Sequence, residues 1–439
     1  MILFAGTVIL SALAGSVLAC IPGLHVYNVM GGLVLLMAAA GHAAPPEILV
    51  AVATALISAY SVVSTVPAVL LAAPDESAFF TVLPGQKMLM QGRGYEAVML
   101  TGMGSLLGLY TLIVLLAPVA SRLLPAARRT LQPHFHWILW CVIAFMLLSE
   151  WPKGGRLGYS RWRRLLDAWK SPGMGLLVFV LSGLLGFLLF YRSPLPASSA
   201  FQNLMPAFVG LFTVPGLLLN MITAVRPPQQ RETRPCGRFV APLLEGSLAG
   251  ALGGGFAAFI PAVTGGVGGM LAGHALAIRN DRAFLASQGA ARAVYYVGGL
   301  LLLFVPDLHM TRGGAAWLLR PHFVPYSREH MLLFLAAAGI AGSIACLTMP
   351  GLARLTVRLA ERAGYQLVSG AALVCAVTIV IVMTGPAGLL VLVGATAIGL
   401  LPPLFGTRRM NALGVILLPL ACNMSGTGPH IAKLLGLLG

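Results

Sequence analysis

The stretch Ile21-Pro22-Gly23-Leu24-His25-Val26-Tyr27-Asn28 divides an apolar run that ends at Cys20 from a second one that begins at Val29. Proline removes a backbone donor and crowds the preceding turn, and glycine adds backbone freedom, so a helix is expected to break here. Lipid cannot satisfy the N–H and C=O groups that a break leaves open, so a break at membrane depth is packed in protein or lines a wet cavity. A related stretch, Phe-Ile-Pro-Ala-Val-Thr-Gly-Gly, occupies residues 259–266. We expect the chain to be organised around these two breaks.

The composition is that of a membrane protein. Of 439 residues, 58% are hydrophobic and 9% are charged, whereas a soluble protein carries about 25% charged residues. The apolar residues form continuous runs, which favour helices over the short alternating strands of a barrel. The net charge of +16 is spread over many short loops, as expected for Lys and Arg on the cytoplasmic side of a bilayer. We predict a multi-pass protein of the cytoplasmic membrane that does not bind nucleic acid.

Fourteen apolar runs are long enough to span or enter the bilayer, seven on each side of a polar, Pro-rich and basic linker. They lie at 2–20, 24–40, 48–72, 97–119, 135–149, 173–191, 204–222, 242–260, 264–278, 290–306, 330–349, 367–384, 386–404 and 410–435. A full span needs about 20 apolar residues, so the short runs 24–40, 135–149 and 264–278 are predicted to be half-helices or re-entrant segments.

An odd number of spans in each half places the two halves in opposite orientations. We therefore predict an all-α integral membrane protein with two inverted-topology repeats of about seven hydrophobic segments each, and broken or re-entrant helices at the Pro/Gly motifs. Residues 1–225 are predicted as the first membrane repeat, 226–240 as a cytoplasmic linker and 241–439 as the second repeat.

A broken helix exposes the N-terminus of its second half. The free N–H groups and partial positive charge of that end suit a carboxylate or a phosphate. Hydroxyl groups near residue 65, where a proline follows, form a further polar cluster in the first half. The candidate substrate-binding residues are Pro22, Gly23, His25, Tyr27, Asn28, Ser64, Thr65, Pro67, Pro261, Thr264, Gly265 and Gly266.

Three ionisable residues near these breaks are candidates for ion coupling or for a structural role. The turn Asp75-Glu76-Ser77 either caps the helix that follows or provides carboxylates that take up a coupling proton or Na⁺, since ionisable groups near the membrane interior are functional candidates. Arg292 opens an apolar run and is suited to pair with an anion or with Asp281.

No pattern of an enzyme is present. The sequence contains no Gly-Lys-Ser/Thr phosphate loop, no His/Glu metal motif and no Gly-x-Ser-x-Gly elbow. We therefore expect neither ATP-driven transport by this chain nor a metal or organic cofactor; Na⁺ or H⁺ is expected only as a coupling ion.

At these motifs the sequence resembles the TctA family, the large membrane subunit of tripartite tricarboxylate transporters, and in particular its divergent archaeal-type branch. The resemblance rests on the early Pro-Gly break Ile21-Pro22-Gly23-Leu24-His25, on Val66-Pro67-Ala68-Val69-Leu70, on Pro74-Asp75-Glu76-Ser77, on Gly85–Gly92 and on the C-terminal Gly399–Pro403 and Gly414–Pro419. It implies an organic anion as substrate, and a small membrane subunit and a periplasmic binding protein as partners.

Two departures from the family pattern fall where substrate contacts are expected. The second break has Ala262 after Pro261, where the family has Pro-Gly, and the first continues as His-Val-Tyr-Asn rather than Gly-Pro-Ala-Thr. The resemblance to the family therefore does not identify which carboxylate this chain would carry. We expect a TctA-like permease that moves an organic anion, preferably a carboxylate, by ion-coupled secondary transport. A polyprenyl-phosphate or lipid-phosphate translocase is the alternative, and a membrane scaffold without transport is a third class.

Overall fold

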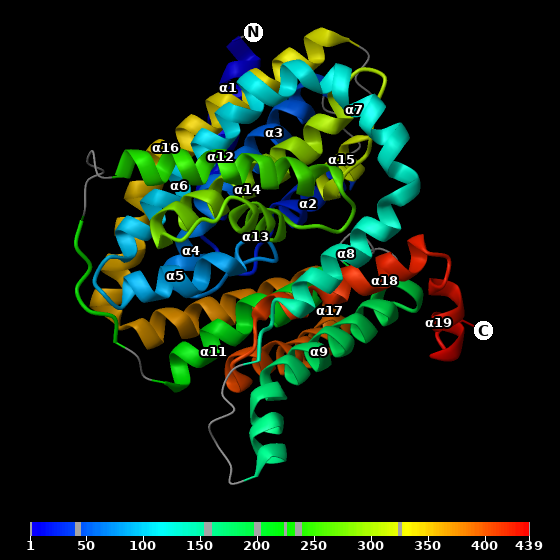
Figure 1. Ribbon diagram of the computed structural model, residues 1–439. Coiled ribbons are helices and arrows are strands. Elements are labelled where there is room, and N and C mark those ends of the chain that lie inside the picture. The colour runs from blue at the N-terminus through cyan, green and yellow to red at the C-terminus, as the bar shows by residue number, and fades with distance from the viewer. Residues whose placement is uncertain are drawn as a thin grey trace. The chain divides into compact units, whose positions relative to one another are not determined.

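The computed structural model describes residues 2–39, 45–152, 160–196, 203–223, 226–232, 239–323 and 327–438, and the regular elements in these ranges are all helical (Figure 1). The chain divides into two compact units. Unit 1 comprises Met1–Thr130 and Gly216–Ala376, and unit 2 comprises Leu131–Pro215 and Val377–Gly439. Three helices run from one unit into the other along the chain: α7 (Ala117–Leu131), α11 (Val214–Ile222) and α17 (Tyr365–Phe405).

The remaining helices of unit 1 carry both Pro/Gly breaks. They are α1 (Ile2–Leu18), α2 (Val26–Ala39), α3 (Pro46–Val63), α4 (Thr65–Leu70), α5 (Phe79–Leu89), α6 (Gly94–Thr111), α12 (Val240–Phe259), α13 (Gly265–Ala275), α14 (Asp281–Phe304), α15 (Gly313–Leu319) and α16 (Arg328–Ala363). The first break separates α1 from α2, and the second separates α12 from α13.

Helix α14 is the centre of unit 1. It packs along α12 on one side and α6 on another, and it also contacts α3, α5 and α13 (Figure 1). Nearly every residue from Leu285 to Phe304 is buried. Small residues permit this packing, because glycines on α6 and α12 let the backbone of α14 approach closely.

A cluster of ion pairs fixes the end of α14 that begins at Asp281. The buried carboxylate of Glu96 on α6 accepts hydrogen bonds from Arg93 at 2.7 and 2.9 Å and from Arg282 at 2.8 Å. Lys87 on α5 lies 2.5 Å from Asp281. These contacts join α5, α6 and α14, and so they hold the α4–α5 turn in register with the face of α14.

Unit 2 is a smaller bundle. Its helices are α8 (Phe135–Leu148), α9 (Arg161–Tyr191), α10 (Met205–Phe208), α18 (Gly414–Met424) and α19 (Gly428–Leu434). Helix α18 packs on α8 and α9. The buried carboxylate of Glu150 accepts hydrogen bonds from Ser171 at 2.9 Å, from Thr407 at 3.0 Å and from the backbone N–H of Arg408 at 2.8 Å. Glu150 thus links the end of α8 to α9 and to the segment before α18.

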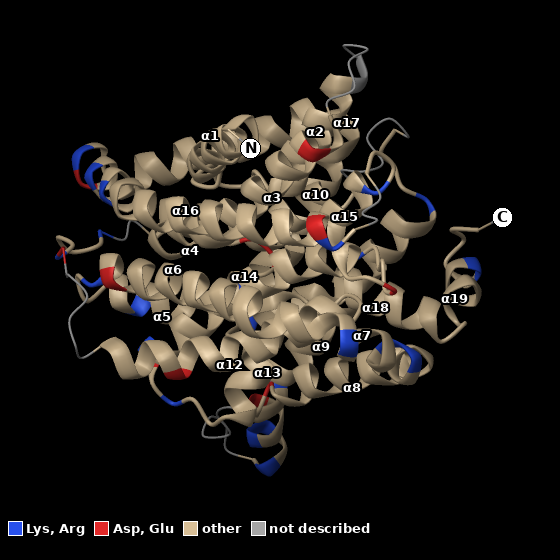
Figure 2. Cartoon of the chain, turned by 90° about the horizontal axis from the view of Figure 1, so that it is seen from above, with Lys and Arg blue, Asp and Glu red and all other residues tan. Residues whose placement is uncertain are grey.

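The helices have the lengths and apolarity of membrane spans. Among the described residues, six continuous helical segments are long and apolar enough to cross a membrane: Pro46–Leu70, Gly94–Leu148, Arg161–Tyr191, Met205–Ile222, Arg328–Ala363 and Tyr365–Phe405. The first joins α3 and α4, and the second joins α6, α7 and α8. A further pair, Arg409–Met424 and Gly428–Leu434, is bent by 115° at the break between its members. In Figure 2 most Lys, Arg, Asp and Glu residues lie near helix ends and in loops. The prediction of an all-α integral membrane protein is confirmed.

The three short apolar runs form short helices. Helices α2, α8 and α13 have 14, 14 and 11 residues, fewer than the roughly 20 that span a bilayer. The inverted relation of the two halves remains a prediction, and so does the division into residues 1–225, 226–240 and 241–439. The two compact units follow packing rather than repeats, and they cut across that division.

Both breaks contain the same backbone turn although their sequences differ. Gly23 has φ of 82° and Ala262 has φ of 59°, and each directly follows a proline. At the first break the N–H of Leu24 donates to the carbonyl of Ile21 at 3.2 Å, which is the pattern of a type II turn with Pro and Gly in the centre. An alanine at the corresponding place of the second break is strained, because a Cβ disfavours the left-handed region.

We expect Ala262→Gly to stabilise the protein by about 1 kcal/mol, since it relieves this strain without changing the turn. The reverse change at the first break, Gly23→Ala, is expected to destabilise by a similar amount. Thermal unfolding in detergent would measure both. A destabilised Ala262→Gly variant would show that the second break does not need a left-handed residue.

Candidate functional site

The candidate site is built on one face of α14. Gln288, Arg292 and Tyr296 recur every four residues, so their side chains lie above one another on the same face of the helix. All three are at most 2% exposed. The α3–α4 bend, the α4–α5 turn and the second break pack against this part of unit 1.

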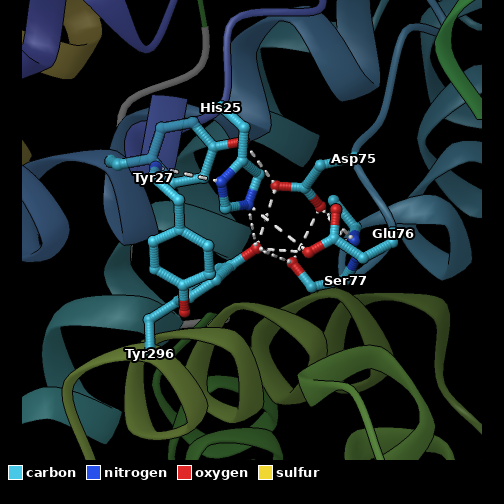
Figure 3. A network of polar contacts seen from close by, with 8 residues as sticks. His25, Tyr27, Asp75, Glu76, Ser77 and Tyr296 are labelled. Atoms are coloured by element: carbon cyan, nitrogen blue, oxygen red, sulfur yellow. Dashed lines mark hydrogen bonds and ion pairs between the residues drawn. The ribbon is translucent and has the colours of Figure 1, made fainter. Parts of the chain in front are cut away.

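The first break brings His25 to this face. The backbone N–H of Tyr27 donates to Nδ1 of His25 at 3.2 Å, so the imidazole caps the first turn of α2. The other ring nitrogen, Nε2, lies 2.9 Å from the hydroxyl of Tyr296 and 3.4 Å from Oε1 of Glu76. Figure 3 shows His25 between Tyr27 and the acidic turn.

The acidic turn has two carboxylates with different surroundings. Oδ1 of Asp75 accepts from the N–H of Ser77 at 2.9 Å and from the N–H of Ala78 at 2.7 Å, and the Ser77 hydroxyl lies 2.7 Å away. Oδ2 accepts from the hydroxyl of Tyr60 at 2.8 Å. Asp75 therefore has the capping geometry that one sequence alternative described, because it closes the turn that leads into α5.

Glu76 points to Tyr296 instead of to the backbone. The hydroxyl of Tyr296 lies 3.2 Å from Oε1 of Glu76 and 3.1 Å from Oγ of Ser77, so one phenol joins the acidic turn to His25 (Figure 3). Glu76 is 5% exposed, and its Oε2 has no hydrogen-bond partner among the described residues.

Arg292 is a buried cation with free donors. Its side chain is 1% exposed, and Nε donates to the carbonyl of Ser61 on α3 at 3.0 Å. Nη1 and Nη2 have no partner among the described residues. The alternative pair with Asp281 does not form, because Asp281 lies at the beginning of α14 and binds Lys87. Arg292 is close enough to Asp75 for their charges to interact.

The second break opens the N-terminus of α13 toward the same face. Thr264 precedes the helix with extended backbone and makes no capping hydrogen bond with its side chain, and Oγ1 of this buried residue has no partner among the described residues. A Cβ on Gly265 would lie 3.0 Å from Cα of Arg292, and one on Gly266 would lie 2.5 Å from the carbonyl oxygen of Ser77. A side chain at Gly266 would overlap the acidic turn, and one at Gly265 would be tight against α14.

Two further predicted residues have buried hydroxyl groups that make no hydrogen bond among the described residues. Ser64 lies at the bend between α3 and α4, and Thr65 is the first residue of α4. Both are buried, and neither hydroxyl has a partner among the described residues. They follow Ser61 by about one turn, so they lie on the part of α3–α4 that accepts the bond from Arg292.

The other predicted residues have supporting positions. Pro22 and Gly23 form the first turn, and Asn28 is buried in the first turn of α2. Pro67 lies inside α4 and Pro261 in the second turn. The structure therefore brings His25, Tyr27, Asp75 and Glu76 into one network, and it brings Gly265 next to Arg292 and Gly266 next to the acidic turn.

Four residues of the site were not predicted: Tyr60, Gln288, Tyr296 and Arg312. Arg312 binds the carbonyl of Ala258 at 3.1 Å and also that of Ile260, so it satisfies the end of α12 at the second break. Gly314, two residues after Arg312, packs against the ring of Tyr27. The recurrence of Gln288, Arg292 and Tyr296 on one helical face was the available signal for Tyr296.

No cluster of three or more His, Cys, Asp or Glu side chains that would suit a metal ion occurs in the described ranges. The site is instead a cation, a carboxylate network and an open helix end, all buried in unit 1 among helices of membrane length. These features define a multi-pass integral membrane protein with broken helices at a buried polar centre.

The comparison with protein families identifies the group. The model of the tripartite tricarboxylate transporter TctA family matches residues 6–414. The chain belongs to this family. The uncharacterized protein MJ1079 of Methanocaldococcus jannaschii is 26% identical over 283 residues, which span 64% of this chain and 64% of that protein. This relative is consistent with a divergent archaeal-type branch. No solved structure matches the chain.

Proposed function

We propose that this protein carries an organic anion, preferably a carboxylate, across the cytoplasmic membrane by ion-coupled secondary transport. The anion binds between α14 and the N-terminus of α13. Arg292, Thr264, Gly265, Gly266, Ser64 and Thr65 are its proposed contacts. His25, Tyr27, Asp75 and Glu76 form the adjoining network that couples its movement to an ion.

The observation that carries this proposal is the guanidinium of Arg292. A buried charge costs several kcal/mol unless it is paired and hydrogen-bonded, yet two of the three nitrogens of this guanidinium have no partner among the described residues. The free edge is the fork that binds carboxylate or phosphate through two parallel hydrogen bonds. An anion at this edge would satisfy both nitrogens.

The end of α13 adds to the same preference. The first N–H groups of a helix have no partner within the helix and carry partial positive charge, and Thr264 leaves them uncapped. Gln288, next to Gly269 of α13, has both polar side-chain atoms without a partner among the described residues. The site therefore offers several neutral donors around a single cation, which suits an anion with more than one oxygen.

Family membership supports the same assignment. Members of the tripartite tricarboxylate transporter family work together with further components. We propose a small membrane subunit and a periplasmic binding protein as partners of this chain, and a cytoplasmic location for the linker at 226–240, where basic residues are concentrated.

Exchange in liposomes tests the function. Purified protein is reconstituted into liposomes loaded with unlabelled succinate, malate or citrate, and entry of the same labelled anion is followed without any ion gradient. For at least one of the three anions, we expect the labelled anion to enter at least about tenfold faster than it enters liposomes without protein. Absence of exchange for all three, with and without a binding protein, would contradict the carboxylate assignment.

The same preparation distinguishes the alternative. A guanidinium fork also binds phosphate, so a lipid-phosphate translocase would use the same edge of Arg292. Translocation of a fluorescent polyprenyl phosphate between leaflets, together with no carboxylate exchange, would replace the proposed substrate with a lipid phosphate.

A further inference from the structure

Glu76 and Asp75 are neighbours in sequence but differ in how well their carboxylates are satisfied. Asp75 accepts from two backbone N–H groups and from Tyr60, and it also contacts the hydroxyl of Ser77. This number of donors favours the ionised form. Glu76 has contacts to one oxygen only, and Oε2 is buried without a partner among the described residues.

The imidazole of His25 is held in one tautomer. Because the N–H of Tyr27 donates to Nδ1, Nδ1 carries a lone pair and the proton of the neutral ring is on Nε2. Nε2 faces Tyr296 at 2.9 Å and Glu76 at 3.4 Å. A second proton on His25 would have to displace the bond from Tyr27, so the ring acts as a donor to Glu76 and not as the group that gains a proton.

We propose that the coupling ion is a proton, and that Oε2 of Glu76 is the atom that takes it up and releases it. This inference rests on the proposed function, because it names the ion of that transport cycle. One proton from water on one side of the membrane binds Oε2 and makes Glu76 a neutral acid. The same proton leaves Oε2 to water on the other side after the site has changed its access.

Electrostatics links this proton to the anion. The titratable groups that interact with Glu76 are His25 and the four phenols Tyr27, Tyr60, Tyr295 and Tyr296. Its charged neighbour in the turn is Asp75, which interacts with Arg292, while Arg312 interacts with Tyr27 and Tyr295. When a carboxylate neutralises Arg292, the acidic turn loses the positive charge that interacts with Asp75. The affinity of Glu76 for a proton then rises, and by linkage the protonated site binds the anion more tightly.

The contacts favour a proton over Na⁺. A metal cation requires several oxygen lone pairs around it. The oxygens of Asp75 are already used as acceptors, and Oε1 of Glu76 faces donors from His25 and Tyr296. A proton needs only the one free oxygen, Oε2.

The test compares exchange of the anion without a gradient with its accumulation in a gradient, both in liposomes. The labelled probe is whichever of succinate, malate and citrate exchanges fastest. The membrane potential is held at zero. We expect an inward proton gradient of about one pH unit to drive about tenfold accumulation of the fully ionised anion at one proton per anion, and an inward Na⁺ gradient to drive none. Accumulation that requires Na⁺ and ignores the pH gradient would overturn the inference.

Glu76→Gln is the diagnostic variant, because the amide keeps the shape and cannot carry the proton. Where Glu76→Gln exchanges the anion without a gradient, its accumulation ratio in a pH gradient should fall to about one. Glu329→Gln, an exposed residue of α16, is the matched control and should accumulate like the wild type. Accumulation by Glu76→Gln at the wild-type ratio would disprove the role of Glu76.

A second measurement covers a Glu76→Gln protein that fails to fold or to exchange. Adding the anion to detergent-purified wild-type protein in weakly buffered solution should raise the pH, because each bound anion brings about one proton with it. Wild-type protein that exchanges the anion but takes up no proton on binding would contradict the inference. Absence of exchange by the wild type itself would instead count against the proposed function.

Discussion

Arg292→Gln is expected to abolish binding of the transported anion while the protein remains folded. Glutamine keeps a polar side chain, although a shorter one, and removes the positive charge and the two free Nη donors. Hydrogen bonds to charged groups contribute about 1.5–3 kcal/mol each, so the loss of about 3 kcal/mol should raise the dissociation constant by more than about 100-fold. Equilibrium binding of labelled succinate, malate or citrate to purified protein measures the change.

Two other variants make the result specific. Arg292→Lys keeps the charge but not the planar fork, and we expect an intermediate loss of affinity. Arg279→Gln removes a charge from an exposed loop residue of the same unit and should bind normally. The melting temperature of Arg292→Gln should stay within a few degrees of the wild type, since the change removes a buried charge whose free edge has no partner among the described residues. Anion binding by Arg292→Gln within threefold of wild type would remove this residue from the site.

The location of the two breaks could be predicted from the sequence because proline has a local effect. A proline in an apolar run predicts an interruption wherever the rest of the chain lies. The equivalence of the two turns could not be predicted with the same ease. Gly23 indicated a left-handed residue, but Ala262 did not, and only the structure shows that both adopt positive φ. Packing around the second break, including the bonds from Arg312, holds Ala262 in a conformation that its own preference opposes.

The acidic turn illustrates a different limit. Asp75 and Glu76 were predicted as a pair, with capping and ion coupling as alternatives. Capping requires a short side chain that reaches the backbone two and three residues later, and Asp75 alone meets it. The surroundings of Glu76 depend on His25 and Tyr296, which are 51 and 220 residues away in the sequence. No local pattern contains that information.

Glycines on α12 and α6 permit close helix packing, but their positions in the sequence do not identify the partner helix. Both helices turn their glycines to α14, where Ala290 lies close to Gly108 from one side and close to Gly250 from the other. The position of Arg292 and Tyr296 in the site depends on this packing, because they lie on the same helix. The interface therefore determines both the stability of unit 1 and the geometry of the proposed anion site.

Gly250→Val is accordingly expected to destabilise unit 1 strongly. A Cβ at this position would overlap the carbonyl oxygen of Ser287 and lie 2.8 Å from Cβ of Ala290 and 2.9 Å from the backbone nitrogen of Ala291. Backbone atoms of α14 cannot move aside as a flexible side chain does, so α12 and α14 must separate. We expect a loss of about 3 kcal/mol or more, the upper range for overpacking.

Gly255→Val is the matched control on the same helix. Its Cβ would meet only Cδ1 of Leu116, at 3.9 Å, which is ordinary van der Waals contact. The intrinsic cost of valine in a helix is the same at both positions, so the difference between the two variants isolates the packing against α14. This difference is measured by thermal unfolding in detergent, monitored as the fraction of protein that remains monodisperse after heating. Equal melting of the two variants would show that α12 and α14 separate without cost. In that case close packing of glycines could not be what holds Arg292 beside the end of α13.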